Sequence, residues 1–318
     1  MKRLILILVL AVLAGCTGDA PFVGRQFQPL LKGPVHAVCY GPHRDGQRPG
    51  GPGPSAAELR EDLSLMQAHW RLLRIYSAGG VAETLLEEIR TGGLEMKVVL
   101  GVWIAPEAAD ANRTEVDTAI RLANTYPGIV AAVCVGNETQ IDWSVHRSPV
   151  ADLIEHVRRV RGKVTVPVTV ADDFNYWNKP ESRVLAAELD FILMHAHPLW
   201  NGLPLDGALA WLQTQLAEVE ALHPGRPVVV GETGWATSVH TEGEQAKLIK
   251  GQAGEAEQTT FHAAVRTWTE QDKLTVFFFE AFDEAWKGGD HPAEVEKHWG
   301  LFNTDRSPKA AVAGSGTD

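Results

Sequence analysis

Cysteine, positive charge and long apolar runs are all scarce in this chain. Its three cysteines are Cys16, Cys39 and Cys134. A metal site needs more ligands than these, and Cys39 and Cys134 lie inside apolar runs, which predicts small buried thiols. A disulfide between these two residues is the alternative.

Basic residues are outnumbered by acidic ones. Lys and Arg total 29 against 40 Asp and Glu, which gives a formal net charge of −11. This balance argues against nucleic acid and anionic membrane surfaces as partners, and it is compatible with a neutral substrate. With 318 residues, 45% of them hydrophobic, the chain is long enough to bury one large core.

The first residues are predicted to direct export and not to join the fold. Met1-Lys2-Arg3 is basic, and the apolar run Leu4–Leu13 is too short for a membrane-spanning helix, so residues 1–15 are interpreted as a signal peptide. Leu13-Ala14-Gly15-Cys16 resembles the lipobox of bacterial lipoproteins. This resemblance implies lipidation of Cys16 and attachment to a bacterial membrane through that anchor only, and Thr17 favours the outer membrane of a Gram-negative host. An ordinary secretory signal with a chance cysteine is the alternative.

Eight short apolar runs alternate with helix-like stretches after a tether at residues 16–34. A short continuous apolar run is typical of a buried parallel strand. The predicted strands are Val35–Tyr40, Leu72–Tyr76, Lys97–Trp103, Ile129–Val135, Val164–Val170, Phe191–Met194, Val228–Val230 and Leu274–Phe279. The predicted helices include Ala56–His69, Val116–Thr125, Val150–Val160, Gly207–Leu222 and Gln258–Glu270. This order predicts a single (β/α)8 barrel over residues 35–310 and a disordered tail at 311–318.

A doubly wound open sheet is the alternative fold. Such a sheet usually carries a Gly-rich phosphate turn after its first strand. The segment Gly41-Pro42-His43-Arg44-Asp45-Gly46-Gln47 follows the first apolar run and does not match that fingerprint. The closed barrel is therefore favoured, with its active site at the C-terminal ends of the strands.

Two of the apolar runs end on a glutamate. Ile129–Val135 is followed by Gly136-Asn137-Glu138, and Val228–Val230 is followed by Gly231-Glu232. In a barrel these glutamates lie across the mouth from each other, and a pair of carboxyl groups is what the cleavage of a glycosidic bond requires. A carboxyl separation of about 5–5.5 Å would indicate a retaining double displacement, and one of about 6.5–9.5 Å an inverting reaction.

Aromatic and acidic side chains also gather after the predicted strands. A flat aromatic face suits the C–H face of a sugar ring. The tryptophans that follow strands are Trp103, Trp143, Trp177, Trp200, Trp235, Trp286 and Trp299. The strand-end tyrosines Tyr40 and Tyr76 are predicted to line the pocket, and Asp172 and Asp173 either bind substrate or cap the following helix.

Several motifs, taken in order, resemble glycoside hydrolase family 17. They are Val38–Pro42, Arg74–Ser77, Gly136–Glu138, Gly231–Trp235, Phe278–Lys287 and His298–Phe302. The similarity extends from about Val35 to about Lys309, which is nearly the whole mature chain. It implies β-1,3-glucan as substrate and retaining chemistry on a (β/α)8 barrel. No cofactor or metal is expected.

The resemblance also implies a role for each strand-end residue. Glu138 resembles the family's acid/base, Glu232 its nucleophile, and Asn137 would bind the sugar 2-hydroxyl. Glu280, Glu284 and Lys287 resemble a polar set that supports the nucleophile. The full set predicted to bind substrate is Asn137, Tyr40, Tyr76, Asp173, Trp177, His197, Trp200, Trp235, Glu280, Glu284 and Lys287.

The chain departs from the family pattern at three positions. Ala236 and Ala285 stand where proline is common, and each change loosens a loop without removing a reacting group. His197 occupies the place where the family often has a tyrosine near the nucleophile. A histidine there can titrate near neutral pH, which affects the expected pH profile.

Other functions stay open on the sequence alone. The favoured activity is hydrolysis of β-1,3-glucan, but a retaining enzyme can also pass its glycosyl group to a second sugar, which would make the chain a glucanosyltransferase. A glucan-binding lipoprotein without catalysis is a further alternative. His195-Ala196-His197 could be a metal-binding pair, although no local motif supplies the remaining ligands.

Overall fold

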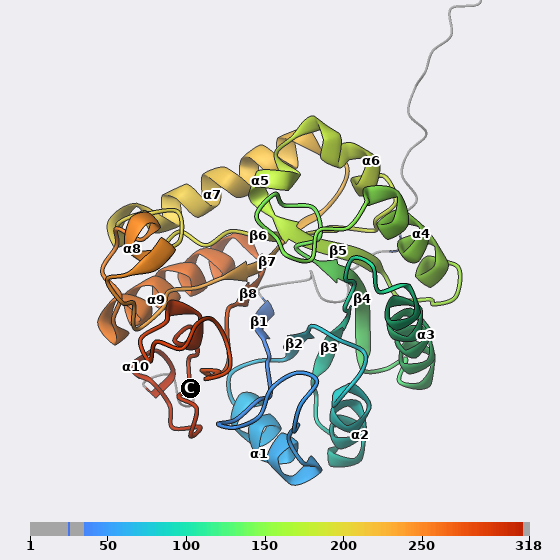
Figure 1. Cartoon of the computed structure of the whole chain (residues 1–318), viewed down its shortest axis with the longest axis horizontal. Helices are drawn as coiled ribbons and strands as arrows, with labels where there is room; N and C mark the ends of the chain where they lie inside the picture. Colours follow the sequence, from blue (N-terminus) through green and yellow to red (C-terminus); the bar gives the residue numbers. More distant parts are fainter. Residues whose placement is uncertain (1–24, 26–34, 314–318) are drawn as a thin grey trace, which may run out of the picture.

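The computed structural model describes residue 25 and residues 35–313 of the chain (Figure 1). The predicted signal peptide, Cys16, nearly all of the tether and residues 314–318 of the tail lie outside the described residues. None of the helices in the described part combines the length and the apolar character that crossing a bilayer requires.

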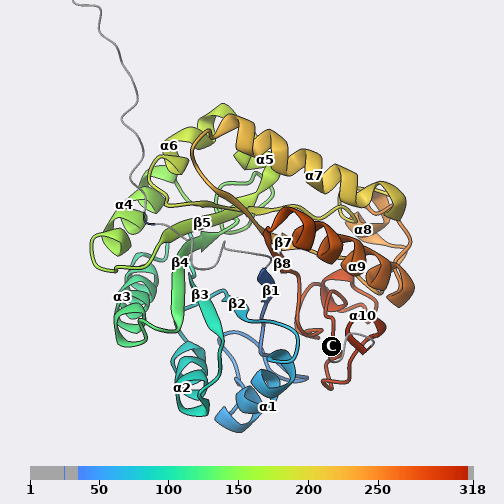
Figure 2. The same ribbon diagram turned by 180° about the vertical axis from the view of Figure 1, so that it is seen from behind.

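Eight parallel strands close into one barrel in sequence order, with β8 hydrogen-bonded to β1 (Figures 1 and 2). The strands are β1 (Val35–Cys39), β2 (Leu72–Ile75), β3 (Lys97–Val102), β4 (Val130–Asn137), β5 (Val168–Asp173), β6 (Ile192–His195), β7 (Val228–Thr233) and β8 (Thr275–Phe278). The predicted (β/α)8 barrel is confirmed, and the open-sheet alternative is wrong.

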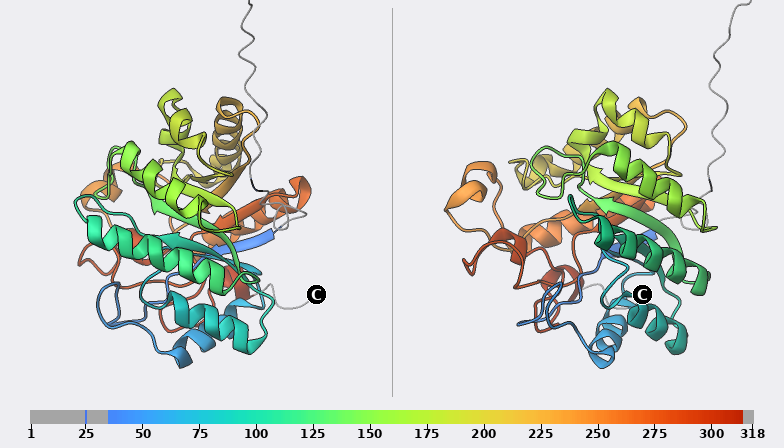
Figure 3. Two further views of the ribbon diagram at one scale, coloured as in Figure 1. Left: turned by 90° about the vertical axis from the view of Figure 1, so that its right-hand side faces the viewer. Right: turned by 45° about the vertical axis from the view of Figure 1, so that its right-hand side comes forward.

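Helices surround the barrel, as the side views in Figure 3 show. They are α1 (Ala56–Met66), α2 (Ala82–Gly92), α3 (Ala109–Thr125), α4 (Val150–Arg161), α5 (Phe174–Trp177), α6 (Arg183–Ala186), α7 (Leu205–Leu222), α8 (Gly243–Leu248), α9 (Glu255–Asp272) and α10 (Ala310–Ala313), with 3-10 turns η1 (Pro180–Ser182) and η2 (Val295–Lys297). Local sequence fixes several helix ends. Ser55 and Glu58 form a reciprocal capping box at the start of α1.

Most strand and helix bounds differ from the sequence-based prediction by one to several residues, and two of the differences are informative. Strand β5 begins at Val168 and not at Val164, because Pro167 has no backbone N–H to join the ladder. Helix α10 continues to Ala313, and Ala311 and Val312 are buried, so the predicted disordered tail began too early. The small apolar residues Ala311 and Val312 were included in the predicted tail, but α10 packs against α9 and buries them.

The apolar core has two separate layers. Side chains of mixed size fill the inside of the barrel: Ala37, Cys39, Leu72, Val99, Ala132, Cys134, Ala171, Phe191, Leu193, Val229 and Phe277. A much larger layer fills the space between strands and helices. Cys39 and Cys134 are both free thiols in the inner layer, so the predicted buried thiols are confirmed and the disulfide is wrong.

An extra residue near the end of β4 and another near the end of β7 direct the side chains that follow toward the barrel axis. In β7, Val229 faces the interior and Val230 the helices, so strict alternation would point Glu232 outward. At this point β7 has two residues, Gly231 and Glu232, where the neighbouring strand β6 has only His195. Such a bulge re-aims the following side chain inward.

Strand β4 carries the matching irregularity. Cys134 pairs with Thr169 and Asn137 with Ala171, so β4 has one residue more than β5 over this stretch. The extra residue accompanies Gly136, which has φ +85°, a left-handed conformation that strongly favours glycine. Both catalytic glutamates predicted from the sequence therefore follow a glycine at a strand irregularity.

The close packing around Gly231 generates a prediction. A Cβ at this position would lie 2.4 Å from Leu193 Cγ inside the barrel. We expect Gly231→Ala to lower the free energy of unfolding by about 1–3 kcal/mol through overpacking, and to reduce activity because Glu232 is displaced. Urea unfolding and kcat/KM measure the two effects.

Gly207 provides the matched control. It lies in α7, and a Cβ added there meets no atom within 4 Å. We expect Gly207→Ala to be neutral or to stabilise the protein by up to about 1 kcal/mol, with unchanged activity. Equal stability of the two variants would contradict the assigned role of Gly231.

Candidate active site

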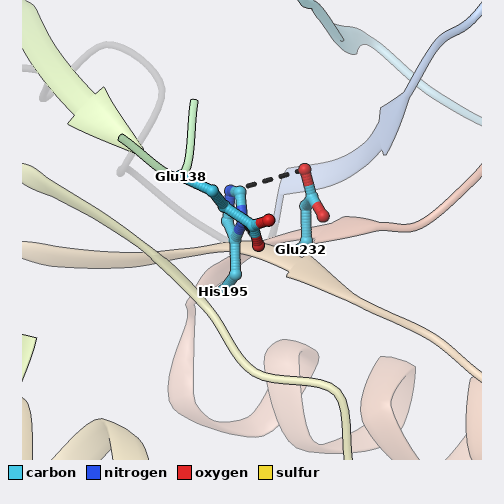
Figure 4. A group of neighbouring side chains, drawn as sticks. All are labelled: Glu138, His195 and Glu232. Carbon is cyan, nitrogen blue, oxygen red and sulfur yellow. Dashed lines mark hydrogen bonds and ion pairs between the residues drawn. The ribbon is translucent and has the colours of Figure 1, made fainter. Parts of the chain in front are cut away.

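The two glutamates predicted to be catalytic meet at the mouth of the barrel. Glu138 directly follows β4, and Glu232 lies near the end of β7. One carboxylate oxygen of each, together with a ring nitrogen of His195, lie within 4.8 Å of one another. Figure 4 shows the imidazole of His195 beside both carboxyl groups.

Glu232 is buried and held by several donors. Its Oε1 accepts hydrogen bonds from Arg74 Nη1 at 2.5 Å and from the Tyr76 hydroxyl at 3.0 Å, and its Oε2 lies 3.2 Å from His197 Nε2. Burial alone would raise the pKa of Glu232, but the neighbouring His195, the Arg74 guanidinium and the hydrogen bond from His197 hold it well below its ordinary value. Glu232 is therefore a carboxylate at neutral pH.

Arg74 binds side chains at the ends of β4 and β7, the two strands that position the residues predicted to be catalytic. Its Nη1 binds Glu232, and its Nη2 donates to Asn137 Oδ1 at 2.5 Å. The guanidinium lies 4.7 Å from the ring centroid of Tyr76, close enough for a cation–π contact. With its Oδ1 held in this way, Asn137 keeps its amino group to donate to a ligand.

Glu138 has a different environment. Its side chain is 31% exposed against 7% for Glu232, and its Oε1 lies 3.0 Å from His195 Nδ1. Its backbone has φ +49°, a left-handed conformation that is uncommon outside glycine, and the N–H is fixed by a hydrogen bond to Ala171 O. The two carboxyl groups thus differ in solvent access and in the number of donors.

Glu280, Glu284 and Lys287 form a second polar group after β8. Lys287 Nζ lies 2.6 Å and 2.7 Å from the two carboxylate oxygens of Glu280 and 2.9 Å from Glu284 Oε2. Burial raises the pKa of Glu280. Although burial also acts on Glu284, its pKa is lowered to about 2 by Lys287 and by hydrogen bonds from His43 and Trp286.

Glu280, Glu284 and Lys287 contact one another, and their predicted roles in supporting the nucleophile and binding substrate stay predictions. The Lys287 ammonium also lies 4.6 Å from the ring centroid of Phe279, which itself contacts His197. The group is therefore connected to the surroundings of Glu232 through an aromatic ring.

Three residues predicted to bind substrate lie in the core. Tyr40 is 1% exposed, and its hydroxyl donates to Asp62. Trp177 is fully buried and packs against Tyr176 and His223. Trp235 is 1% exposed, and its indole N–H donates to Gln252 O. These predictions are wrong, because the three side chains belong to the layer between strands and helices, Tyr40 and Trp235 from just beyond their strands and Trp177 from the end of α5.

Asp173 and Trp200 lie nearer the site, and their sugar contacts stay predictions. Asp173 caps α5 by accepting from Asn175 N, which is the capping alternative considered above, and burial raises its pKa to about 6. Trp200 is half-buried and donates from Nε1 to Glu296 Oε1 at 2.9 Å. Of the other strand-end tryptophans, Trp143 is 63% and Trp286 41% exposed, while Trp299 is buried.

Sequence reasoning did not select Arg74, His195 or Glu296 as site residues. A signal for Arg74 existed, because a charged residue interrupts the apolar run Leu72–Ile75 at an inward-facing position. His195 was considered only as a metal ligand. Glu296 follows no strand directly, and only the fold brings it to Trp200.

Glu138, His195 and Glu232 are spaced so that they could hold a cation. The Arg74 guanidinium already supplies a positive charge to Glu232. His195 and His197 approach different oxygens of Glu232, so the pair contacts a carboxylate from two sides. The donor set fits a charge-balanced carboxylate better than a metal centre.

Residues 37–300 match the model of the BtgE/BtgC glycoside hydrolase domain. The chain is 28% identical to a glucan 1,3-beta-glucosidase of Arthroderma benhamiae, over 83% of this chain and 86% of the relative. Two further fungal relatives are longer, and the chain spans 42% of each.

Solved structures share the fold over most of the chain. An endo-laminarinase from Formosa Hel1_33_131 is 26% identical with a TM-score of 0.79, covering 89% of this chain and 86% of that one. A glycoside hydrolase family 17 beta-1,3-glucanosyltransferase from Rhizomucor miehei is 24% identical with a TM-score of 0.71, covering 87% and 96%. The family 17 resemblance predicted from the motifs is confirmed.

The position of Arg74 generates a prediction. Arg74→Met removes the cation that binds both Glu232 and Asn137, and leaves a buried carboxylate with fewer partners. We expect the free energy of unfolding to fall by about 3–5 kcal/mol and kcat/KM to fall by roughly 10²-fold or more. The double variant Arg74→Met/Glu232→Gln should regain much of the stability and none of the activity. An unchanged unfolding midpoint in Arg74→Met would contradict this role.

Proposed function

The chain belongs to the BtgE/BtgC glycoside hydrolase domain family, and on that basis we propose that it hydrolyses β-1,3-glucan with retention of configuration. Glu138 is the acid/base and Glu232 the nucleophile. The observation that carries this proposal is the pair of carboxyl groups, whose oxygens approach within 4.8 Å. One oxygen of each carboxyl group lies within this distance of the other, which is compatible with a double displacement, for which carboxyl groups about 5–5.5 Å apart are typical.

The different surroundings of the glutamates suit their two roles. A nucleophile must be ionised, and Glu232 is buried among the donors of Arg74, Tyr76 and His197. An acid/base must exchange protons with the leaving group and with water. Glu138 has the more exposed carboxyl group, which permits this exchange.

In the first step, Glu232 attacks C1 of the sugar while Glu138 donates its proton to the glycosidic oxygen. The C1–O bond breaks, an ester forms between C1 and Glu232, and Glu138 becomes a carboxylate. In the second step, Glu138 takes a proton from water as that water attacks C1, and the ester bond breaks to restore the Glu232 carboxylate. Asn137, held by Arg74, is positioned to donate to the 2-hydroxyl, where contacts strengthen in the transition state.

Transglycosylation is the second candidate activity. The glycosyl-enzyme ester can be resolved by a sugar hydroxyl in place of water, with the same atom balance. Exposed tryptophans favour sugar acceptors, and Trp143 and Trp286 present 63% and 41% of their surface. Products longer than the starting oligosaccharide would identify this activity.

We also propose that the chain is exported and anchored by a lipid on Cys16. The support is the sequence Leu13-Ala14-Gly15-Cys16 after a short apolar run. Arg25 binds the base of the barrel: its backbone N–H donates to Asp190, and its side chain to Val166 O and Arg161 O. These partners lie near the N-terminal ends of β5 and β6, so an anchor upstream leaves the catalytic mouth on the opposite side.

The two glutamates generate the central prediction. We expect Glu138→Gln to lower kcat on linear β-1,3-gluco-oligosaccharides by roughly 10²–10⁴-fold, and Glu232→Gln by on the order of 10⁶-fold. The anomer released by the native enzyme, followed by NMR during the first turnovers, should be β. Glu218→Gln on the exposed face of α7 is the control and should retain full activity. An α anomer, or near-native rates in either glutamate variant, would contradict the proposal.

The anchor is tested separately. Cys16→Ser removes the thiol that would carry the lipid, so we expect the exported protein to move from the membrane to the soluble fraction. Activity on soluble oligosaccharides should not change, because the barrel is intact. Retention of the variant in washed membranes would contradict lipidation at Cys16.

A further inference from the structure

His195 is the one side chain that contacts both catalytic carboxyl groups, among the residues that the structure describes. It lies at the end of β6 and is completely buried. Its Nδ1 is 3.0 Å from Glu138 Oε1, and its Nε2 is 3.4 Å from Glu232 Oε1, where it has no hydrogen-bond geometry with any described group. The reaction described above assigns no part to it.

The two contacts restrict the protonation state of the ring. A neutral imidazole has one N–H and one lone pair. With the proton on Nδ1, the lone pair of Nε2 faces the Glu232 carboxylate. With the proton on Nε2, the lone pair of Nδ1 faces Glu138 Oε1, which is repulsive whenever that oxygen carries no proton. Only the imidazolium keeps an N–H toward Glu138 throughout the reaction and also carries a positive charge 3.4 Å from Glu232 Oε1.

We propose that His195 is a positioning residue that works as a buried imidazolium cation and stabilises the negative charge that Glu138 acquires when it protonates the leaving group. Its Nε2 lies 3.4 Å from Glu232 Oε1, so the same cation also favours ionised Glu232. The inference rests on the proposed roles of these glutamates.

The charged groups around His195 offset the free-energy cost of burying an imidazolium there. The titratable and charged groups around His195 and its carboxylate partners come from five strands: Arg74, Glu138, Asp173, His197 and Glu232. Two of them are positive or can be, and three are carboxyl groups. An imidazolium beside Glu232, and beside Asp173 wherever that group is ionised, therefore has a carboxylate partner when Glu138 is protonated, whereas a buried cation without such partners would lose its proton.

The charge on His195 can be observed directly. We would record long-range ¹H–¹⁵N spectra of the ¹⁵N-histidine-labelled protein across pH 5–7 and assign His195 from its missing signals in His195→Asn. We expect both ring nitrogens of His195 to be protonated over this range. His262, buried on α9 with a pKa lowered to about 3 by burial, is the internal control and should remain a neutral tautomer; His262→Asn assigns it.

Kinetics separate this electrostatic role from a structural one. An aryl β-laminaribioside with a dinitrophenolate leaving group departs without protonation, so Glu138 gains no charge in the first step. We expect His195→Asn to lower kcat/KM on laminari-oligosaccharides roughly 10²-fold, and on the aryl substrate by much less. If the asparagine variant folds poorly, His195→Gln replaces it. His262→Asn should leave both rates unchanged.

The outcomes are distinct. A neutral tautomer of His195 in the spectra, or equal losses of kcat/KM on the two substrates, would overturn the proposal while leaving the roles of the glutamates intact. A native enzyme that releases no sugar from β-1,3-glucan would instead defeat the proposed function, and the spectra would still report the charge on His195.

Discussion

The buried ion pair between Arg74 and Glu232 is the interaction on which the rest of the site depends. Arg74 is 1% and Glu232 7% exposed, and their atoms approach to 2.5 Å. Removing either partner would leave a charge without compensation inside the barrel, which is far more costly than losing an exposed ion pair. Because Arg74 also holds Asn137, the same cation fixes the spacing between the end of β4 and the end of β7.

This arrangement requires that the alternation of inward-facing and outward-facing side chains be interrupted near the ends of β4 and β7. A regular strand that places Val229 inside the barrel would send Glu232 toward the helices. The irregularity at Gly231 reverses that direction, and Gly136 accompanies the same change before Asn137 and Glu138. Each glycine before a glutamate that we propose to be catalytic is therefore explained by backbone geometry, since Gly136 adopts φ +85° and Gly231 has no room for a Cβ.

The sequence predicted the barrel and both glutamates because these depend on local patterns: apolar runs of strand length and the residue that follows each run. It failed for Tyr40 and Trp235 because one residue of register near a strand end decides whether a side chain faces the pocket or the helices, and composition does not report register. It failed for Trp177 because that residue lies in α5, where the helix turns its side chain into the core. His195 and Glu296 were missed for another reason. Their importance comes from partners 57 and 96 residues away, which only the closed barrel brings together.

The two-layer core explains how the barrel tolerates so many charges at its mouth. Most apolar burial lies between strands and helices, while the inner layer consists largely of small side chains such as Ala37, Ala132 and Ala171. Stability therefore depends mainly on the outer layer. The last inward-facing positions of the strands are left free for polar groups, provided that each charge has a partner. Arg74 with Glu232, and Lys287 with Glu280 and Glu284, meet that condition. The same reasoning applies to His195: a fully buried ring between two carboxyl groups is stable as a cation only because its partners are carboxylates, so its charge and theirs depend on each other.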